Sequence, residues 1–360
     1  MLIKKKIFVV VPELRHGGTE KFILNLLAKL KNNFDISICC IGAHDKYFLD
    51  NYKKDNLNII FLNSSIKFVL FRLIKEIYNN KPDIVFSNLW AANILSAICK
   101  LLSFHKFKLL LREGNPYLKE INYKIPFFLI KILISISYLV SNKIIMNTKG
   151  LENHILEYSL FNIKNKSMMI NNGININKIE ENNQRKKSEI IKLLYISKLR
   201  SQKDLVTIFK AVKVLLKKHN CVLTIVGDGE ERDKLINKAK NINILDKISF
   251  EGNRNYLDEY YNSNDIFIFS SFYEGGPNVI LESLKYDIPI ISSDCNYGPK
   301  EFLNNGEYGD LFSVGDYKHL AKLILKNYKT NINLKKRQNW MKKFDKKNTL
   351  EKYMKIFNSL

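Results

Sequence analysis

Two consecutive series of short apolar segments limit the folds open to this chain more than any other feature. Each series contains segments rich in β-branched residues, separated by stretches with helical periodicity. The first series covers residues 7–11, 36–41, 58–62, 83–87 and 108–112. The second covers residues 192–197, 222–227, 248–252, 265–270 and 288–293. Continuous apolar strands that alternate with helices are typical of parallel sheets covered on both faces, so the sequence predicts two doubly wound α/β domains.

The region between the two series resembles a linker. Apolar periodicity lapses over residues 168–189, where Asn, Gly and charged residues dominate, so we expect the domain crossing near Asn172 and Gly173. A length of 360 residues also favours two domains, because one hydrophobic core rarely grows so large. The expected parts are an N-terminal domain over 1–172, a second domain over 173–338 and a closing helix over 339–360 that packs back toward the first domain.

The chain is strongly basic, with a formal net charge of +23 from 58 Lys and Arg against 35 Asp and Glu. Such an excess attracts phosphates, whether on nucleic acid, anionic lipid or a nucleotide diphosphate. No arginine-rich tail or zinc-type spacing singles out nucleic acid, so we expect no nucleic-acid partner. The five cysteines form no Cys-x-x-Cys pair, which is typical of reduced thiols and predicts a cytoplasmic protein.

One segment raises the question of a membrane. Residues 125–140 are the most apolar part of the chain, but Pro126 and Lys131 interrupt them and they fall short of the ~20 residues that span a bilayer. The lysine-flanked stretch 121–143 would suit peripheral docking on the inner face of an anionic membrane. A buried helix with a lysine-rich rim is the alternative, and the sequence leaves both open.

The stretch SSFYEGGPNVILESL places one carboxylate in a glycine-rich turn and another in the helix that follows. Pro277 suits the first position of that helix, and Gly275 and Gly276 would let an anionic ligand approach the free N–H groups. Glu274 lies in the turn, whereas Glu282 leans back toward the helix start, so the two carboxylates can hold different ends of one ligand. The alternative is a capping acid and a solvated helix acid.

Cations follow the strand at 192–197 in the stretch YISKLRSQKDL. Lys198 and Lys203 would lie at the carboxyl end of that strand, where open α/β sheets bind ligands, and could pair with a diphosphate. In so basic a chain, solvent-exposed lysines are the competing interpretation.

Two further glycine turns join a strand to a helix. VGDGEE is only half of a dinucleotide fingerprint, so it supports NAD binding weakly. In PELRHGGTEK, Gly17 and Gly18 leave room for a phosphate, and Thr19 could cap the helix.

Taken together and in this order, these motifs resemble those of the retaining glycosyltransferases of family 4. The resemblance covers nearly the whole chain and is strongest over 190–312. It implies the GT-B fold, in which two Rossmann-like domains face each other across a cleft, with the acceptor on the first domain and the nucleotide sugar on the second. The motifs are Gly17–Gly18, Asn172–Gly173, SKLRSQKD, VGDGEE, FEG, EGGPNVILE and NGEYGDLF.

The resemblance also implies roles for individual residues. Glu274 would contact the transferred sugar and Glu282 the donor ribose, while Lys198 and Lys203 would neutralise the leaving diphosphate. Lys198 departs from the family, which usually has arginine at this position. An arginine guanidinium can donate two hydrogen bonds to one phosphate, whereas the ammonium of Lys198 acts as a point charge. The other donor contacts implied are Gly17, Gly18, Gly227, Gly252, Asn253, Gly275, Gly276, Pro277, Asn278 and Val279.

A second departure lies in the N-terminal domain. Many members carry a histidine at the end of a strand there, whereas this chain has Ser87 and Asn88 after one strand and Arg112, Glu113 and Asn115 after the next. The last three residues are our candidates for contact with the acceptor.

The stretch SSDCNYGPKEFL resembles members that add N-acetylhexosamine or galactose to lipid-linked bacterial surface glycans. This likeness implies a UDP-sugar donor, a polyprenyl-diphosphate-linked acceptor and a role in polysaccharide or glycoprotein glycan assembly. No Asp-x-Asp pair stands out at a strand end, so we expect no metal requirement. For the reaction, we favour a substitution in which the acceptor attacks the sugar on the same face from which the leaving group departs. A GT-B-fold UDP-sugar epimerase and a non-enzymatic glycan- or nucleic-acid-binding protein remain as alternatives.

Overall fold

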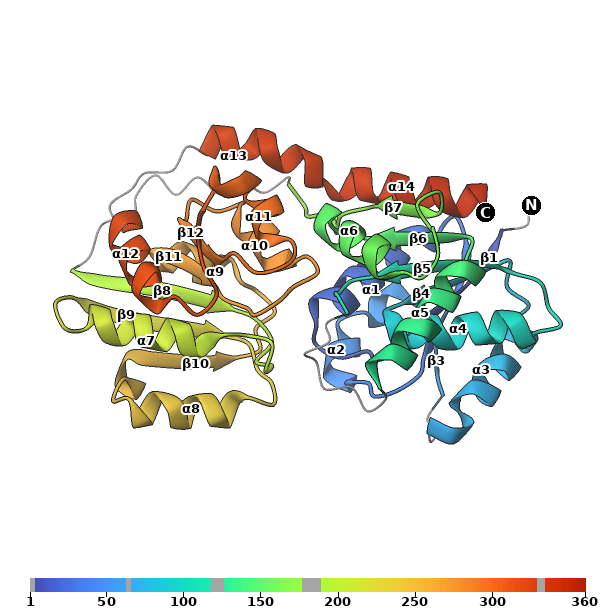
Figure 1. Cartoon of the computed structure of the whole chain (residues 1–360), viewed down its shortest axis with the longest axis horizontal. Coiled ribbons are helices and arrows are strands. Elements are labelled where there is room, and N and C mark those ends of the chain that lie inside the picture. Colours follow the sequence, from blue (N-terminus) through green and yellow to red (C-terminus); the bar gives the residue numbers. More distant parts are fainter. Residues whose placement is uncertain (1–3, 63–65, 118–125, 177–188, 329–333) are drawn as a thin grey trace. The chain divides into compact units, whose positions relative to one another are not determined.

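The computed structural model describes residues 4–62, 66–117, 126–176, 189–328 and 334–360 (Figure 1). Contacts between Cα atoms divide the chain into two units. Unit 1 comprises Met1–Gly173 and Lys347–Leu360, and unit 2 comprises Ile174–Lys346. Each unit contains one parallel sheet with helices on both faces, so the predicted fold class is confirmed.

The sheet of unit 1 has seven strands in the order β3-β2-β1-β4-β5-β6-β7. All five apolar segments of the first series form strands. Strands β6 and β7 were not predicted, because β6 follows the apolar stretch 125–140 with only two residues between them and β7 has only three residues. The strands are β1 (Lys6–Val11), β2 (Asp35–Cys40), β3 (Asn58–Phe61), β4 (Ile84–Asn88), β5 (Lys108–Glu113), β6 (Lys143–Met146) and β7 (Ser167–Met169).

Side chains that alternate along the strands of unit 1 build two cores. On β1, Phe8 and Val10 join one core, whereas Ile7, Val9 and Val11 join the other. The first core is covered by α3 (Ile66–Asn80), α4 (Trp90–Leu102), α5 (Phe127–Val140) and α6 (Lys149–Tyr158). The second is covered by α1 (Gly18–Leu30), α2 (Lys46–Asp50) and α14 (Lys346–Ser359).

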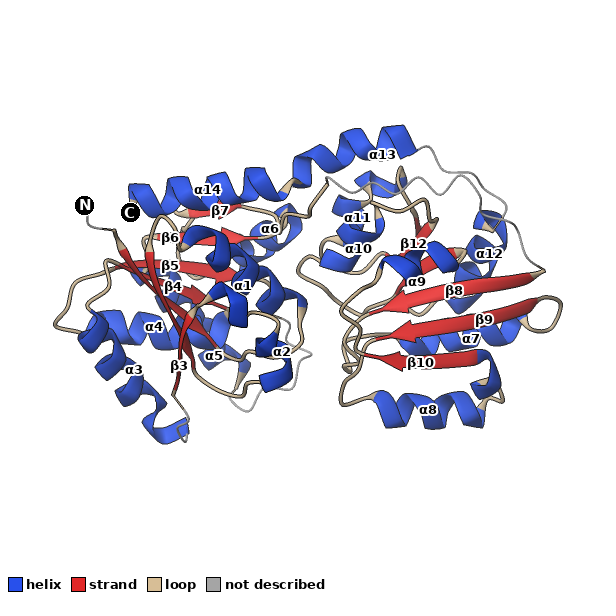
Figure 2. Ribbon diagram, turned by 180° about the vertical axis from the view of Figure 1, so that it is seen from behind, coloured by secondary structure: helices blue, strands red, loops and turns tan. Residues whose placement is uncertain are grey.

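The sheet of unit 2 has six strands in the order β10-β9-β8-β11-β12-β13, all parallel (Figure 2). The second apolar series accounts for every strand except β13, which has three residues. The strands are β8 (Ile190–Ile196), β9 (Asn220–Val226), β10 (Ile248–Gly252), β11 (Ile266–Phe269), β12 (Ile290–Ser293) and β13 (Asp310–Phe312).

Helices again cover both faces of this sheet. One core contains side chains of α7 (Leu205–Leu215), α8 (Arg232–Asn241) and α12 (Tyr317–Asn327). The opposite core contains side chains of α9 (Asp258–Ser263), α10 (Asn278–Ser283), α11 (Pro299–Phe302) and α13 (Leu334–Met341). Short 3₁₀ turns lie at Lys53–Asp55, Leu245–Lys247, Asn304–Gly306 and Lys342–Phe344.

The C-terminal tail differs from the single closing helix that we expected over 339–360. It forms two helices, α13 and α14, because the backbone between them bonds sideways to another segment. Ile174 N donates to Phe344 O at 2.8 Å, and Lys346 N donates to Ile174 O at 2.9 Å. Consequently Trp340 and Phe344 pack in unit 2, while α14 completes a core of unit 1 with Tyr353 and Phe357.

Candidate active site

The strand order of unit 2 reverses between β8 and β11, and the carboxyl ends of two such strands flank the crevice where open α/β sheets bind ligands. The loop after β8 contains the predicted cations, and the turn after β11 contains the first predicted carboxylate. Backbone hydrogen bonds join these segments. Asp204 N donates to Ser270 O at 3.2 Å, and Phe272 N donates to Gln202 O at 3.0 Å. The sequence motifs therefore meet at one point of unit 2.

Lys203 and Glu274 form an ion pair at this point. The Lys203 Nζ contacts Glu274 Oε1, and the two side chains are only 11% and 8% exposed. Ser271 Oγ donates a second hydrogen bond to Oε1 at 2.7 Å, and Lys203 Nζ lies 5.0 Å from the centroid of the Phe269 ring. Because a buried charge without its partner is costly, the pair holds both side chains in place. Ser271 was not predicted, although two serines at the end of a strand could have signalled it.

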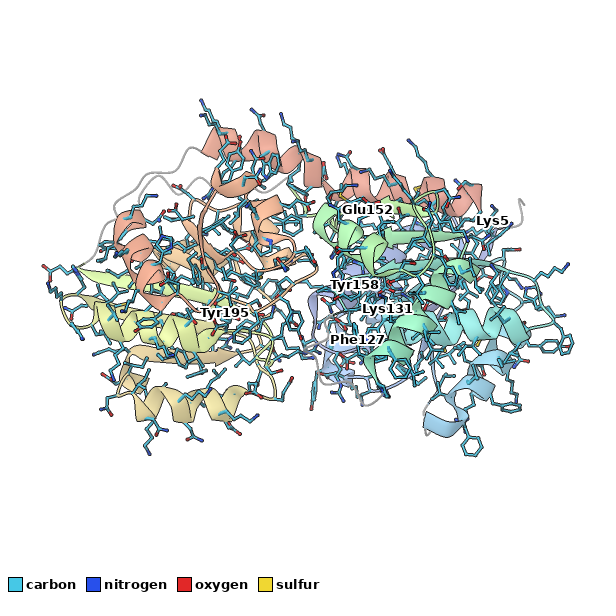
Figure 3. All side chains as sticks on the ribbon, in the orientation of Figure 1. Lys5, Phe127, Lys131, Glu152, Tyr158 and Tyr195 are labelled. Carbon is cyan, nitrogen blue, oxygen red and sulfur yellow. The ribbon has the colours of Figure 1, made fainter. Side chains whose placement is uncertain are left out.

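The charge of Glu274 reaches three neighbouring side chains. Burial raises the pKa of the Cys295 thiol to about 12, and the negative charge of Glu274 adds to that rise. Burial also raises the pKa of Tyr273. The negative charge of Glu274 raises it further, whereas the positive charge of Arg200 lowers it. Tyr195, labelled inside unit 2 in Figure 3, has a pKa well above its usual value, chiefly through burial. The site is thus a low-dielectric environment in which a fixed charge acts strongly.

The turn that carries Glu274 packs on the loop after β12. Glu274 N donates to Asn296 O, and Tyr297 N donates to Glu274 O at 2.5 Å. Gly298 has a φ of +106°, and a Cβ there would lie 2.9 Å from the Cα of Gly276. Neither Asn296 nor Gly298 was predicted as part of the site, although both belong to the NYG stretch that follows the strand at 288–293.

The helix after this turn is shorter than expected. Pro277 is its N-cap and not its first residue, and α10 has six residues. Glu282 is half-buried on α10. Its negative charge adds to the effect of burial in raising the pKa of Tyr261, whose ring stacks on Tyr286 with centroids 4.3 Å apart.

Gly227 and Gly252 occupy the ends of β9 and β10 for different reasons. Gly227 has a φ of +130°, which favours glycine. A Cβ there would also lie 1.9 Å from Ser197 O, so the close packing of the two loops requires glycine even apart from the backbone conformation. Gly252 has a φ of +67° and open space around the Cβ position. Gly227 N donates to Gly252 O at 2.8 Å, which joins the two turns.

The remaining predicted donor residues also lie in loops of unit 2. Gly275 is buried in the turn after β11, and Asn278 and Val279 are half-buried at the start of α10. Asn253 is exposed after β10, and Lys198 is half-buried after β8. The described residues contain no group of three or more His, Cys, Asp or Glu that could hold a metal ion.

In unit 1, the space beside Gly17 is occupied. Helix α1 begins at Gly18 with Gly17 as its N-cap, so Thr19 does not cap it as we expected. A Cβ on Gly17 would lie 2.1 Å from Oε2 of Glu20, which means that a carboxylate rests against this glycine. An acid in the first turn is favourable at a helix N-terminus, and a phosphate bound beside Gly17 would have to displace it.

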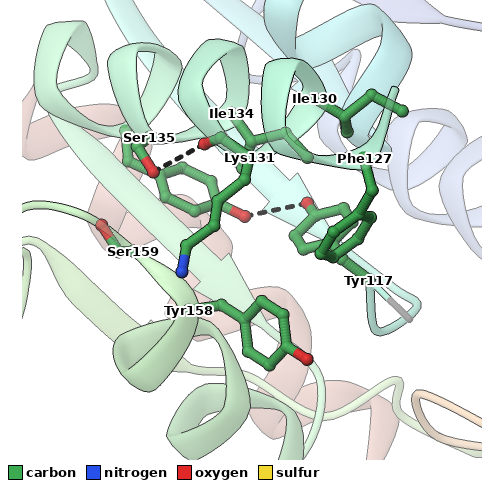
Figure 4. Close-up of a pocket in the computed structure, with 9 residues that line it drawn as sticks. Tyr117, Phe127, Ile130, Lys131, Ile134, Ser135, Tyr158 and Ser159 are labelled. Carbon is green, nitrogen blue, oxygen red and sulfur yellow. Dashed lines mark hydrogen bonds between the residues drawn. The ribbon is translucent and has the colours of Figure 1, made fainter. Parts of the chain in front are cut away.

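Glu113, one of the candidate acceptor residues, lies in a buried network. Its Oε1 accepts hydrogen bonds from Asn93 Nδ2 at 2.6 Å and from the Tyr138 hydroxyl at 3.2 Å. The Tyr138 hydroxyl also meets that of Tyr117 at 2.8 Å, and both side chains line the small pocket drawn in Figure 4. Burial raises the pKa of Glu113 to about 7, although these hydrogen bonds oppose the rise. Glu113 is therefore readily protonated near neutral pH.

Arg112 is fully buried beside it. Its Nη2 donates to Asn172 Oδ1 at 2.6 Å, and the guanidinium carbon lies 4.9 Å from the centroid of the Phe22 ring. Its Nε and Nη1, like both side-chain polar atoms of Asn88, have no hydrogen-bond partner in the described part of the chain. Asn115 alone among the three candidates is exposed. Asn115 is therefore accessible to a ligand, whereas Arg112 and Glu113 lie beneath the surface.

Comparison with known proteins identifies the family of the second unit. Residues 176–347, which include both loops of the Lys203–Glu274 pair, match the family described as glycosyl transferases group 1. These residues, just under half of the chain, belong to this family. As a group 1 glycosyltransferase the chain is an enzyme of a family whose members transfer a hexose with retention, which sets aside the epimerase and the non-enzymatic binding protein.

Relatives of this glycosyltransferase extend over most of its length. It is 28% identical over 250 residues to an uncharacterized glycosyltransferase of Methanocaldococcus jannaschii, a match that covers 65% of this chain and 61% of that protein. It is 25% identical over 324 residues, 86% of each chain, to a Campylobacter jejuni enzyme. That enzyme is the N-acetylgalactosamine-N,N'-diacetylbacillosaminyl-diphospho-undecaprenol 4-alpha-N-acetylgalactosaminyltransferase.

A solved structure shows the same architecture. Anabaena HepE in complex with UDP-glucose superposes with a TM-score of 0.80 at 15% identity, over 99% of this chain and 100% of that one. This likeness shows the GT-B fold that the sequence predicted.

Proposed function

We propose that unit 2 binds a UDP-sugar and that the enzyme transfers a hexose or N-acetylhexosamine to a polyprenyl-diphosphate-linked glycan in surface glycan assembly. The observation that carries this proposal is the buried Lys203–Glu274 pair at the strand-order reversal of unit 2. The UDP-glucose named with HepE and the diphospho-undecaprenol in the name of the Campylobacter enzyme support the choice of donor and acceptor.

The pair gives each partner a task. A carboxylate accepts hydrogen bonds from sugar hydroxyls, so Glu274 holds the transferred sugar, and a lysine attracts a diphosphate as a point charge. In the structure, Lys203 is paired with Glu274. When the diphosphate binds, it competes for Lys203 and leaves the carboxylate to the sugar. Glu282 binds the ribose, and Lys198 adds a second cation next to the diphosphate.

The reaction then needs little from the protein beyond placement and charge. The bond between the anomeric carbon and the diphosphate oxygen breaks, and the acceptor oxygen forms the new bond on the same face. The departing diphosphate takes the acceptor proton. Lys203 and Lys198 stabilise the negative charge that grows on the diphosphate, and preorganised charges in a buried site are usually the largest contribution to such a barrier.

The acceptor lies against unit 1 in this proposal, and Asn115 contacts it. Arg112 and Glu113 position the loop that carries Asn115, because they precede it directly and are fixed by Asn172 and Asn93. A lipid-linked acceptor requires the enzyme to work at the inner face of the cytoplasmic membrane.

A donor screen tests this function. Purified enzyme is incubated with UDP-galactose, UDP-N-acetylgalactosamine, UDP-glucose, UDP-N-acetylglucosamine or GDP-mannose, together with lipid-diphosphate saccharides, and release of the nucleotide is measured. We expect one UDP-sugar to release UDP only when an acceptor is present. Transfer from GDP-mannose alone would refute the UDP assignment, and no transfer from any donor would refute the acceptor class.

A further inference from the structure

Helix α5 turns an apolar face to the solvent. Exposed side chains recur on one side of the helix, and Phe128, the largest of them, is 63% exposed. The opposite side packs Ile130, Ile134 and Tyr138 into the core. The exposed residues are Phe128, Leu129, Ile132, Ile136 and Leu139. A surface helix of a globular protein normally presents charged residues to water, so this face departs from the usual pattern.

The neighbouring helices extend the same surface. Helix α4 contacts both α3 and α5, and the three lie in one layer over the sheet (Figure 1 and Figure 2). Helix α3 exposes Phe68, Phe71 and Tyr78. The end of α4 and the loop after it expose Leu101, Leu102 and Phe104, the last of which is 99% exposed. We call the outward side of α3, α4 and α5 with this loop the outer helical face. Large apolar side chains exposed on neighbouring helices mark a binding surface.

The helices of the outer helical face contain more basic than acidic side chains. The described side chains of the three helices include Arg72, Lys75, Lys100 and Lys131 against the single acid Glu76. Lys131 reaches from α5 toward Tyr158, whose ring centroid is 5.4 Å from its Nζ (Figure 3). Long lysine side chains beside exposed apolar residues are typical of helices that lie in a lipid interface.

A basic pocket borders the exposed end of α4. Its lining includes Lys5, Lys100, Lys106 and Lys108, and its one acid, Asp83, already accepts a hydrogen bond from Lys6 N at 2.7 Å. Burial lowers the pKa of Lys100, and the charges of Lys108 and Lys166 lower it further. This pocket therefore concentrates like charges that an external anion would neutralise.

We propose that the outer helical face docks on an anionic phospholipid bilayer, with the apolar side chains of α5 and the α4 end among the acyl chains and the pocket lysines on headgroups. A second copy of the chain fits less well, because a symmetric contact would bring the lysines of the two copies together. None of the described helices is long and apolar enough to cross a membrane, so the docking is peripheral. Its use in presenting a lipid-linked acceptor rests on the proposed function, whereas the binding itself does not.

Flotation of the full-length protein with lipid vesicles tests the proposal. We expect flotation with vesicles that contain phosphatidylglycerol, little with pure phosphatidylcholine, and weaker binding in high salt. Replacing Phe128, Ile132 and Ile136 together by serine should lower the bound fraction about tenfold, because their apolar area drives insertion. The matched control replaces Val214, Tyr256 and Leu325, which are exposed apolar residues of unit 2, and should bind like the wild type.

A second variant separates charge from apolar insertion. Lys106→Glu with Lys108→Glu changes exposed residues of the pocket and should lose most binding to the anionic vesicles. Unchanged flotation of both variants, or no flotation of the wild type, overturns the proposal. A wild-type dimer that the triple serine variant abolishes, without vesicle binding, would show that the face joins two copies instead. If vesicles bind as expected but no donor is ever consumed, the proposed function fails and the docking surface stands.

Discussion

At the scale of the residue, the ion pair between Lys203 and Glu274 is held by few groups, and each can be changed alone. Ser271 donates to the same oxygen of Glu274 that Lys203 contacts, so it fixes the carboxylate without itself carrying charge. The adjacent Ser270 is equally buried, but its hydroxyl has no partner among the described residues. These two serines therefore form a matched pair for mutation.

Ser271→Ala should lower kcat by about tenfold to a hundredfold, since a hydrogen bond to a charged group contributes about 1.5–3 kcal/mol. The KM for the donor should change little, because Lys203 and Lys198 still hold the diphosphate. Ser270→Ala is the control and should keep nearly full activity. Steady-state kinetics of UDP release measures both variants, and equal rates for the two would contradict the role given to Ser271.

The glycines at the ends of β9 and β10 make a second comparison. Gly252→Ala should cost about 1–2 kcal/mol, which is the penalty of a left-handed backbone for a residue with a Cβ. Gly227→Ala should cost more, because its Cβ would also meet Ser197 O at 1.9 Å and force the two loops apart. Chemical unfolding of both variants provides the comparison. A smaller loss for Gly227→Ala than for Gly252→Ala would show that the loops relax freely.

At the scale of the element, the network between β5, α4 and α5 couples the fold of unit 1 to pH. Burial raises the pKa of Glu113 from 4.5 to about 7, so the folded state holds a proton that the unfolded chain has already released. The protonated form supports the fold fully below about pH 4.5, and this contribution falls as pH rises to about 7. Above about pH 7, Glu113 is a buried anion, and the loss in free energy of unfolding no longer changes with pH.

Glu113→Gln should remove this dependence, because the amide is isosteric and does not ionise. The stability of the wild type relative to the Gln variant should therefore fall by about 3 kcal/mol across the interval, from the 1.36 kcal/mol that each pKa unit represents. Urea unfolding of both proteins at several pH values measures the difference. A difference that stays constant with pH would contradict a raised pKa at Glu113.

The sequence predicted those strands that are formed by a continuous run of apolar residues. Every run of the two series is a strand. Strands β7 and β13 are too short to give such a run, and β6 follows the apolar stretch 125–140 too closely to stand apart from it. The tail had helical spacing throughout, but a backbone pairing with Ile174 divides it, and periodicity carries no information on a contact so distant in sequence.

The site was predictable in its residues but not in its contacts. Lys203 and Glu274 were assigned to different parts of the ligand, and their pairing depends on how two strands lie side by side. The part played by Ser271, and the carboxylate of Glu20 beside Gly17, are likewise visible only in three dimensions.

At the scale of the whole molecule, we propose that the donor binds to unit 2 and the acceptor to unit 1. The family match covers nearly all of unit 2, whereas the candidate acceptor residues Arg112, Glu113 and Asn115 lie in unit 1. The proposed donor residues Lys203 and Glu274 lie within the matched segment. The outer helical face belongs to the same unit as the proposed acceptor site.

If Lys203 holds the diphosphate and Glu274 the transferred sugar, each is needed for transfer, and UDP release by three variants measures that need. Lys203→Met and Glu274→Gln should each lower the rate with donor and acceptor by about a hundredfold to a thousandfold, as loss of an electrostatic contact to the reacting group does. Lys234→Met, which breaks the exposed pair of Lys234 with Glu231, is the control and should match the wild type. Wild-type rates from folded Lys203→Met or Glu274→Gln protein would contradict the account.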